Sequence, residues 1–86
     1  MLEVSRFFGL IISMYFNDHL PPHFHVRYGS QKAIVGIRNL ALLKGRLAPR
    51  AFSLAAEWAA KHGEELRANW KRARSNKPPA KIAPLE

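Results

Sequence analysis

The sequence of 86 residues contains no cysteine, so neither disulfide bonds nor thiolate metal ligands contribute to this chain. It also has no long apolar segment. The longest, Phe7 to Ile12, is interrupted by Gly9 and is far too short to cross a bilayer. The first residues show no basic start followed by a small-residue cleavage site. These absences predict a soluble cytoplasmic protein of one small domain, with no membrane partner.

Acidic residues are scarce, with six Asp and Glu against fourteen Lys and Arg, which gives a formal net charge of +8. No acid lies between Asp18 and Glu57, and a second acid-free stretch runs from Arg67 to Lys81. A positive field of this kind attracts polyanions, nucleic acid above all, although basic charge also serves solubility alone. The candidate phosphate contacts are Arg27, Lys32, Arg38, Arg67, Lys71 and Arg74.

Alternating apolar residues in the first half of the chain predict an antiparallel sheet. We expect a lead-in or a frayed strand start over residues 1–6, followed by strands over residues 8–16, 23–28 and 32–38 and a short edge strand over residues 42–46. Gly29 and Ser30 form a hairpin turn signal. One face of this sheet is apolar, and the other collects His23, His25 and Arg27 with further cations. A cationic sheet face of this type is used by proteins that bind single-stranded nucleic acid, whereas an ordinary solvated face is the alternative.

The second half of the chain predicts one long helix from Pro49 to Ser75, with Trp58 and Leu66 on its apolar stripe and Gly63 as a candidate kink. After it, three prolines predict an extended tail whose Ile82 and Leu85 either pack back on the domain or pair with a partner. The fold class is therefore α+β, with a three- to four-stranded antiparallel sheet and one long C-terminal helix packed on one face. The domain spans residues 1–75 and the tail residues 76–86.

The segment from Tyr15 to Tyr28, YFNDHLPPHFHVRY, contains three histidines, an aspartate and two prolines. His23 and His25 are alternate residues of a predicted strand, so their side chains point the same way. Asp18, His19, His23 and His25 make an acceptable ligand set for a divalent metal such as zinc. His23 and His25 are also candidate catalytic acids or bases. In the alternative interpretation, Asp18 only caps a turn and the histidines are ordinary strand residues.

The same segment resembles the motif of the family catalogued as domain of unknown function 4160. The residues that carry the resemblance are Tyr15, Asn17, Asp18, His19, Pro21, Pro22, His23, His25 and Val26, followed by Lys32 to Ile37, Gly45 to Pro49, Trp58, His62, Glu65, Leu66 and Trp70. The resemblance implies a compact bacterial domain, often encoded beside a partner similar to domain of unknown function 2442 in an arrangement like toxin-antitoxin or regulatory pairs. It implies no catalytic residues. The chain departs from the pattern at Arg38 to Lys44, where similar sequences tend to have a polar, often acidic turn.

We therefore expect a small basic module that binds RNA or DNA within a two-protein regulatory or toxin-antitoxin-like unit. Two alternatives use the same surface. One is a phosphodiester hydrolase, metal-dependent or histidine-based, that uses His19, His23 and His25. The other is a pure interaction domain for an acidic partner protein. Whether the chain is an enzyme stays open, and no cofactor is indicated besides the divalent metal.

Overall fold

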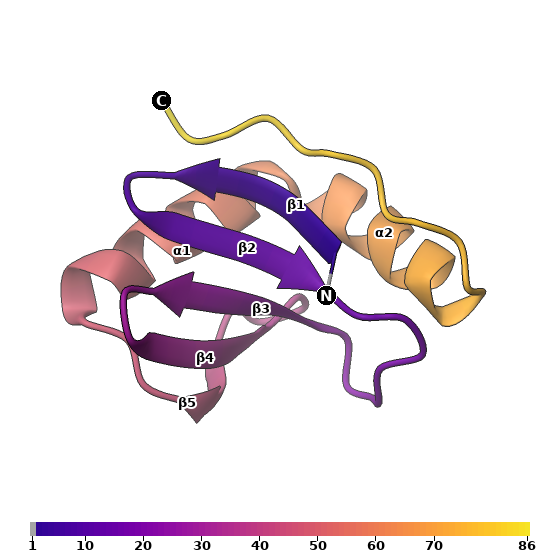
Figure 1. Cartoon of the computed structure of the whole chain (residues 1–86), viewed down its shortest axis with the longest axis horizontal. Coiled ribbons are helices and arrows are strands. Elements are labelled where there is room, and N and C mark those ends of the chain that lie inside the picture. Colours follow the sequence, from indigo (N-terminus) through magenta and orange to yellow (C-terminus); the bar gives the residue numbers. More distant parts are fainter. Residues whose placement is uncertain (1) are drawn as a thin grey trace.

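The computed structural model describes residues 2–86 and shows one antiparallel sheet with two helices on one of its faces (Figure 1). The strands are β1 (Leu2–Phe7), β2 (Leu10–Met14), β3 (His23–Tyr28), β4 (Gln31–Gly36) and β5 (Leu42–Gly45). Each strand pairs with the next one in the chain, so the spatial order is β1-β2-β3-β4-β5. The α+β class is confirmed, but the expected three to four strands are corrected to five.

The additional strand comes from a hairpin at the start of the chain. The sequence predicts a lead-in or a frayed strand start over residues 1–6, of which Met1 lies outside the described residues, and one strand over residues 8–16. The structure has β1 and β2 instead, joined by a tight turn at Phe8 and Gly9 with positive φ angles of 46° and 83°. Two consecutive residues with positive φ suit a two-residue hairpin turn. Phe8 is an unusual residue there, and for this reason the turn was missed.

The other strands lie close to the expected ranges. In the β3–β4 ladder, Arg27 lies opposite Lys32 and His25 opposite Ile34. The expected edge strand is present as β5, with a register shift between Ile34 and Val35 where it pairs with β4. These pairings place the alternate side chains of three neighbouring strands in rows across the sheet.

Gly36, at the end of β4, is a position where a side chain would not fit without a shift of its neighbours. A Cβ atom at this position would lie 2.9 Å from the side-chain oxygen of Asn39 and 3.6 Å from Leu43. Gly36 is buried at the end of β4, so the space that its missing side chain leaves is occupied by the chain itself.

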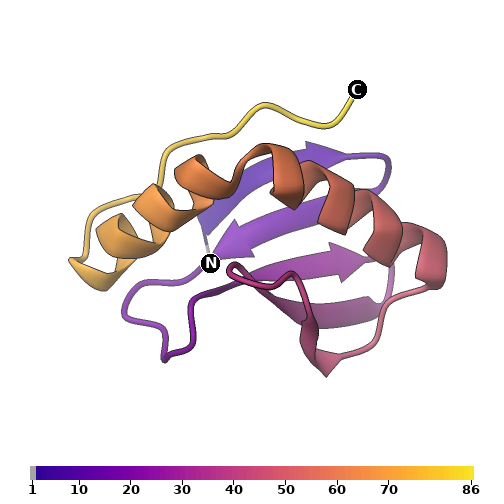
Figure 2. The same ribbon diagram turned by 180° about the vertical axis from the view of Figure 1, so that it is seen from behind.

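The expected single helix is corrected to two, α1 (Pro49–Lys61) and α2 (Gly63–Arg74), which follow one another across the sheet with a change of direction (Figure 2). His62 separates them with a non-helical φ of −124°. Its Nδ1 lies 2.6 Å from Glu65 Oε1. Acidic residues in the first turn favour a new helix N-terminus, and α2 has Glu64 and Glu65 there, which accounts for the break beside Gly63.

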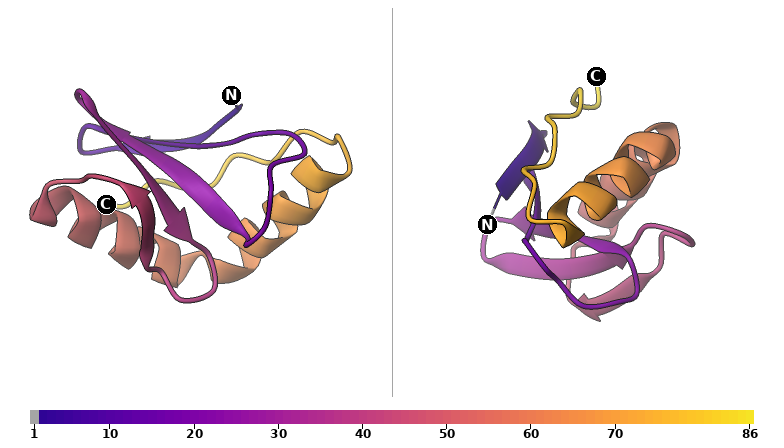
Figure 3. Two further views of the ribbon diagram at one scale, coloured as in Figure 1. Left: turned by 90° about the horizontal axis from the view of Figure 1, so that it is seen from below. Right: turned by 90° about the vertical axis from the view of Figure 1, so that its right-hand side faces the viewer.

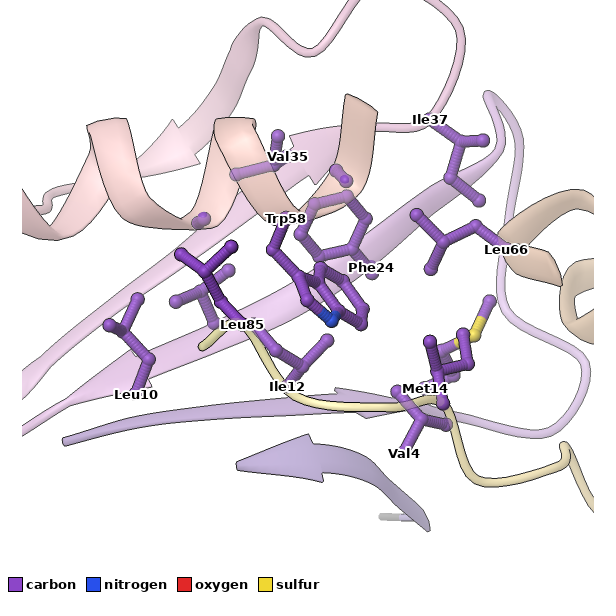
Figure 4. Packing of buried hydrophobic residues seen from close by; sticks show 14 of the residues in the cluster. Val4, Leu10, Ile12, Met14, Phe24, Val35, Ile37, Trp58, Leu66 and Leu85 are labelled. Carbon is purple, nitrogen blue, oxygen red and sulfur yellow. The ribbon is translucent and has the colours of Figure 1, made fainter. Parts of the chain in front are cut away.

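Trp58 is fully buried at the centre of the core between α1 and the sheet (Figure 4). Its ring centroid lies 5.5 Å from that of Phe7 and 5.9 Å from that of Phe24. Both helices cover the same face of the sheet, as the two views of Figure 3 show, and the opposite face is left without a helix. Within residues 2–86, neither helix is long and apolar enough to cross a membrane.

The last ten residues run back along the domain beside β1 (Figure 1). The amide of Ile82 donates to the carbonyl oxygen of Val4 at 2.8 Å, and Trp58 Nε1 donates to the carbonyl oxygen of Ala83 at 2.8 Å. The side chains of Ile82 and Leu85 are buried in the core. Of the two alternatives for this tail, the structure therefore shows packing on the domain, which also covers part of the β1 edge.

Candidate functional site

The loop between β2 and β3 is held by the C-terminal end of α2. The amide of Asn17 donates to the carbonyl oxygen of Ala73 at 3.1 Å, and its side-chain nitrogen donates to Asn76 Oδ1 at 2.7 Å. Arg74 Nη1 donates to the carbonyl oxygen of Asp18 at 3.1 Å. The Leu20–Pro21 peptide bond in this loop is cis. Contacts more than fifty residues apart in sequence thus fix the position of Asp18.

The Asp18 carboxylate connects the histidines of this segment. Its Oδ2 lies 2.8 Å from His23 Nε2 and 2.9 Å from His25 Nε2, while its Oδ1 accepts a hydrogen bond from the His19 amide at 2.9 Å. Burial raises the pKa of the Asp18 carboxyl group, but hydrogen bonds from His25, His23 and the His19 amide outweigh this effect and lower the pKa to about 2. Asp18 is therefore a carboxylate at neutral pH.

His23 is buried, with 2% of its side chain exposed, and both of its ring nitrogens face oxygen acceptors. Nδ1 lies 2.8 Å from the carbonyl oxygen of Pro21, and Nε2 lies 2.8 Å from Asp18 Oδ2. A carbonyl oxygen only accepts, so Nδ1 carries a proton. Nε2 lies beside the Asp18 carboxylate, and two arrangements are compatible with this contact. Either Nε2 carries a proton and donates it to the carboxylate, or its lone pair binds a cation that the carboxylate also binds.

The other two histidines differ in their surroundings. The side chain of His25 is 25% exposed, and its ring centroid lies 4.4 Å from that of Tyr15. The side chain of His19 is 82% exposed, and its Nδ1 lies 3.1 Å from Oδ1 of Asp18 rather than from the oxygen that the other rings share. The ligand atoms of Asp18, His23 and His25 all lie within 4.8 Å of one another. The structure thus brings together three of the four predicted metal ligands and both predicted catalytic histidines.

A groove of about 320 Å³ lies beside His25 on the sheet face that the helices leave open. Two of the predicted phosphate contacts, Arg27 and Lys32, line it from neighbouring strands. Lys44 of β5 is a third cation there, and the sequence interpretation missed it, although the expected edge strand would have placed it next to β4. The full lining is Ser13, Tyr15, His25, Val26, Arg27, Lys32, Ala33, Ile34, Lys44 and Gly45, and none of these residues is acidic.

The other four predicted phosphate contacts lie outside the groove. Arg38 is exposed in the connection from β4 to β5, and Arg67 and Lys71 are exposed on α2. Arg74 also lies on α2, with its guanidinium carbon 5.9 Å from the Trp70 ring centroid. None of these four cations lines the groove with Arg27 and Lys32.

The chain matches a protein-family model. The model of the family described as "Domain of unknown function (DUF4160)" matches residues 9–71, which include the Asp18 cluster and the whole groove lining. Neither the curated proteins nor the solved structures yielded a match. Because the family model covers well over half of the chain, this protein belongs to the DUF4160 family.

Proposed function

We propose that the groove on the open sheet face binds the phosphodiester backbone of single-stranded RNA or DNA. The observation that carries this proposal is the cross-strand pair of Arg27 and Lys32, with Lys44 on the next strand and no acid in the groove lining. Like charges directly opposite each other destabilise a sheet. A bound phosphate relieves this repulsion, so the arrangement suits an anion better than it suits the free protein.

The aromatic wall of the groove supports a nucleic acid over a small anion. Tyr15 is 41% exposed, and its ring lies against that of His25 with an interplanar angle of 42°. An exposed ring beside a cationic groove is a surface on which a base can stack while phosphates meet the cations.

Fluorescence anisotropy with short labelled single-stranded RNA and DNA tests this function. Binding should weaken steeply with salt, by about 0.7 in the logarithmic slope for each phosphate contact. Arg27→Ala should weaken binding and reduce the salt slope. Arg50→Ala removes the same charge from an exposed position on α1 and should change neither the affinity nor the salt slope. Absence of a salt slope in the unmodified protein would exclude the proposal.

The two-protein unit stays part of this proposal, with a partner similar to domain of unknown function 2442. An acidic partner protein, acting without nucleic acid, is the competing use of the same cations. Titration with polyglutamate distinguishes the two. If polyglutamate binds as tightly as the oligonucleotides and Tyr15→Ala affects neither, the groove recognises acidic protein rather than nucleic acid.

Phosphodiester hydrolysis is a second candidate because His25 belongs both to the groove wall and to the Asp18 cluster. The hydrogen bond from Nε2 to the carboxylate orients the ring and leaves Nδ1 as the nitrogen that would accept a proton from an attacking hydroxyl. Arg27, in the same groove, would stabilise the charge that develops on the phosphate. Cleavage of labelled RNA that is lost in His25→Ala, with the far-ultraviolet circular dichroism spectrum unchanged, would support this activity. Cleavage that persists in the variant would exclude it.

A further inference from the structure

One carboxylate oxygen of Asp18 is shared by two imidazole nitrogens. Oδ2 lies within 2.9 Å of Nε2 of both His23 and His25, and the cluster lies at the end of the sheet next to Trp70, whose ring centroid is 5.1 Å from that of His23. Two nitrogens and a carboxylate oxygen that converge from a strand and a loop form a donor set for a cation.

The surroundings of His23 fix its donor nitrogen in the way that metal sites require. A histidine that binds a metal through one nitrogen usually donates from the other to a carbonyl or carboxylate oxygen, which fixes the tautomer. His23 has this arrangement, because its Nδ1 faces the Pro21 carbonyl oxygen at 2.8 Å and its Nε2 faces the cluster. On the side of the carboxylate, Arg74 and the Asn17 contacts hold the loop, so the three donors are positioned before any ion arrives.

We propose that Asp18, His23 and His25 bind one divalent transition-metal ion of the zinc class, with His19 outside the coordination sphere. Imidazole nitrogen favours zinc, cobalt, nickel or iron over magnesium and calcium, which prefer oxygen ligands. Three protein ligands leave a coordination position open, as in catalytic zinc sites. His25 is the most exposed of the three ligands and also lines the groove, so a bound ion would lie next to it. Metal binding does not rest on the proposed nucleic-acid binding, and its test contains no nucleic acid.

Titration of the chain, purified without a histidine tag, with Co²⁺ tests the site through its visible absorption. We expect one Co²⁺ per chain, displacement by an equivalent of Zn²⁺, and no displacement by excess Mg²⁺. His25→Ala and Asp18→Asn should each weaken Co²⁺ binding by more than about 100-fold, beyond the loss typical of outer-sphere changes. His19→Ala is the matched control on the same loop: its ring contacts Asp18 from outside the coordination sphere, so any loss of affinity should stay below about 100-fold, within the range of outer-sphere changes.

Because His23 is buried, its replacement risks unfolding, so an NMR titration of the unmodified protein provides the second measurement. Addition of Zn²⁺ should shift the ring signals of His23 and His25 and leave those of His62 in place. If the protein takes up no stoichiometric Co²⁺ or Zn²⁺, or if His62→Ala rather than His25→Ala abolishes uptake, the proposed site does not exist. In the first case the cluster is only a set of hydrogen bonds between Asp18 and the two imidazole rings.

Discussion

Arg74 Nη1 donates a hydrogen bond to the main-chain carbonyl oxygen of Asp18 at 3.1 Å, so the last turn of α2 touches the residue that connects the histidine cluster. The partners are 56 residues apart in the sequence. The same guanidinium lies near the Trp70 ring, which in turn lies against His23. The helix end therefore supports the cluster from two sides, through the loop carbonyl and through an aromatic ring.

Arg74→Ala should lower the free energy of unfolding by at most about 1 kcal/mol, because a charge-assisted hydrogen bond is lost from an exposed site. It should also weaken Co²⁺ binding, since Asp18 is then held less firmly. Arg72→Ala removes the same charge from the same exposed helix turn and is the control. Urea denaturation and the cobalt titration measure the two effects. If both variants lose the same stability and the same Co²⁺ affinity, the loss of positive charge explains the effects and the hydrogen bond from Arg74 does not.

Acid should destabilise the metal-free protein through Asp18. Its pKa is about 2 in the folded state and 3.8 ordinarily, so the unfolded state binds the proton more readily and stability falls as the pH falls. The stabilisation, of the order of 2 kcal/mol, is fully present above about pH 4 and is lost between about pH 4 and pH 2. Denaturation curves in the presence of a chelator should show this loss in the unmodified protein and much less of it in Asp18→Asn. A parallel loss in both would assign the acid effect to other groups.

Removal of one cation from the groove should raise stability while it lowers binding. Lys32→Ala relieves the repulsion between Lys32 and Arg27 and should add a few tenths of a kcal/mol at low ionic strength, an effect that salt screens. Affinity for a labelled oligonucleotide should fall in the same variant. Urea denaturation at low and high salt measures the change in stability, and fluorescence anisotropy measures the change in affinity. A loss of stability at low salt would show that Lys32 has a structural role that the ladder does not reveal.

The tail should contribute to the core as a helix or strand does. Ile82→Ala removes a buried side chain and should cost about 2 to 4 kcal/mol, a large part of the stability of a domain of this size. The neighbouring variant Lys81→Ala changes an exposed residue and should lie within about 0.5 kcal/mol of the unmodified protein. Thermal and urea denaturation compare them. If Ile82→Ala is as stable as Lys81→Ala, the packing of residues 77–86 on the domain is of no consequence in solution.

Alternation of apolar residues and turn residues predicted those strands and turns whose conformation depends on neighbouring residues in the sequence. Alternation from His23 to Tyr28 and the Gly29 turn predicted β3 and β4 well, because strand register follows the burial of one face. The Phe8 turn was missed, since its positive φ is rare for a bulky residue. The helix break at His62 was also missed, because the apolar stripe continues on both sides of it, although Gly63 was noted as a weak point.

Part of the candidate site could also be predicted from neighbouring residues, and part depends on contacts between distant residues. The common direction of His23 and His25 follows from their strand, and their proximity to Asp18 agrees with a short stiff loop. The outward position of His19 depends on how that loop turns, and the loop is held by Asn17 contacts to Ala73 and Asn76. Contacts between positions so distant leave no periodic signal in one sequence, and neither does the return of the tail to Val4.

The position of His25 has a thermodynamic consequence. One imidazole ring serves as a wall of the groove and as a member of the Asp18 cluster, so an ion on its Nε2 and a strand of nucleic acid against its face share a single side chain. If both proposed ligands bind, any factor by which the metal changes the affinity for nucleic acid is the factor by which nucleic acid changes the affinity for the metal. In this chain of 86 residues, the concentration of metal would then change the affinity for nucleic acid through a single imidazole ring, without a second conformation of the protein.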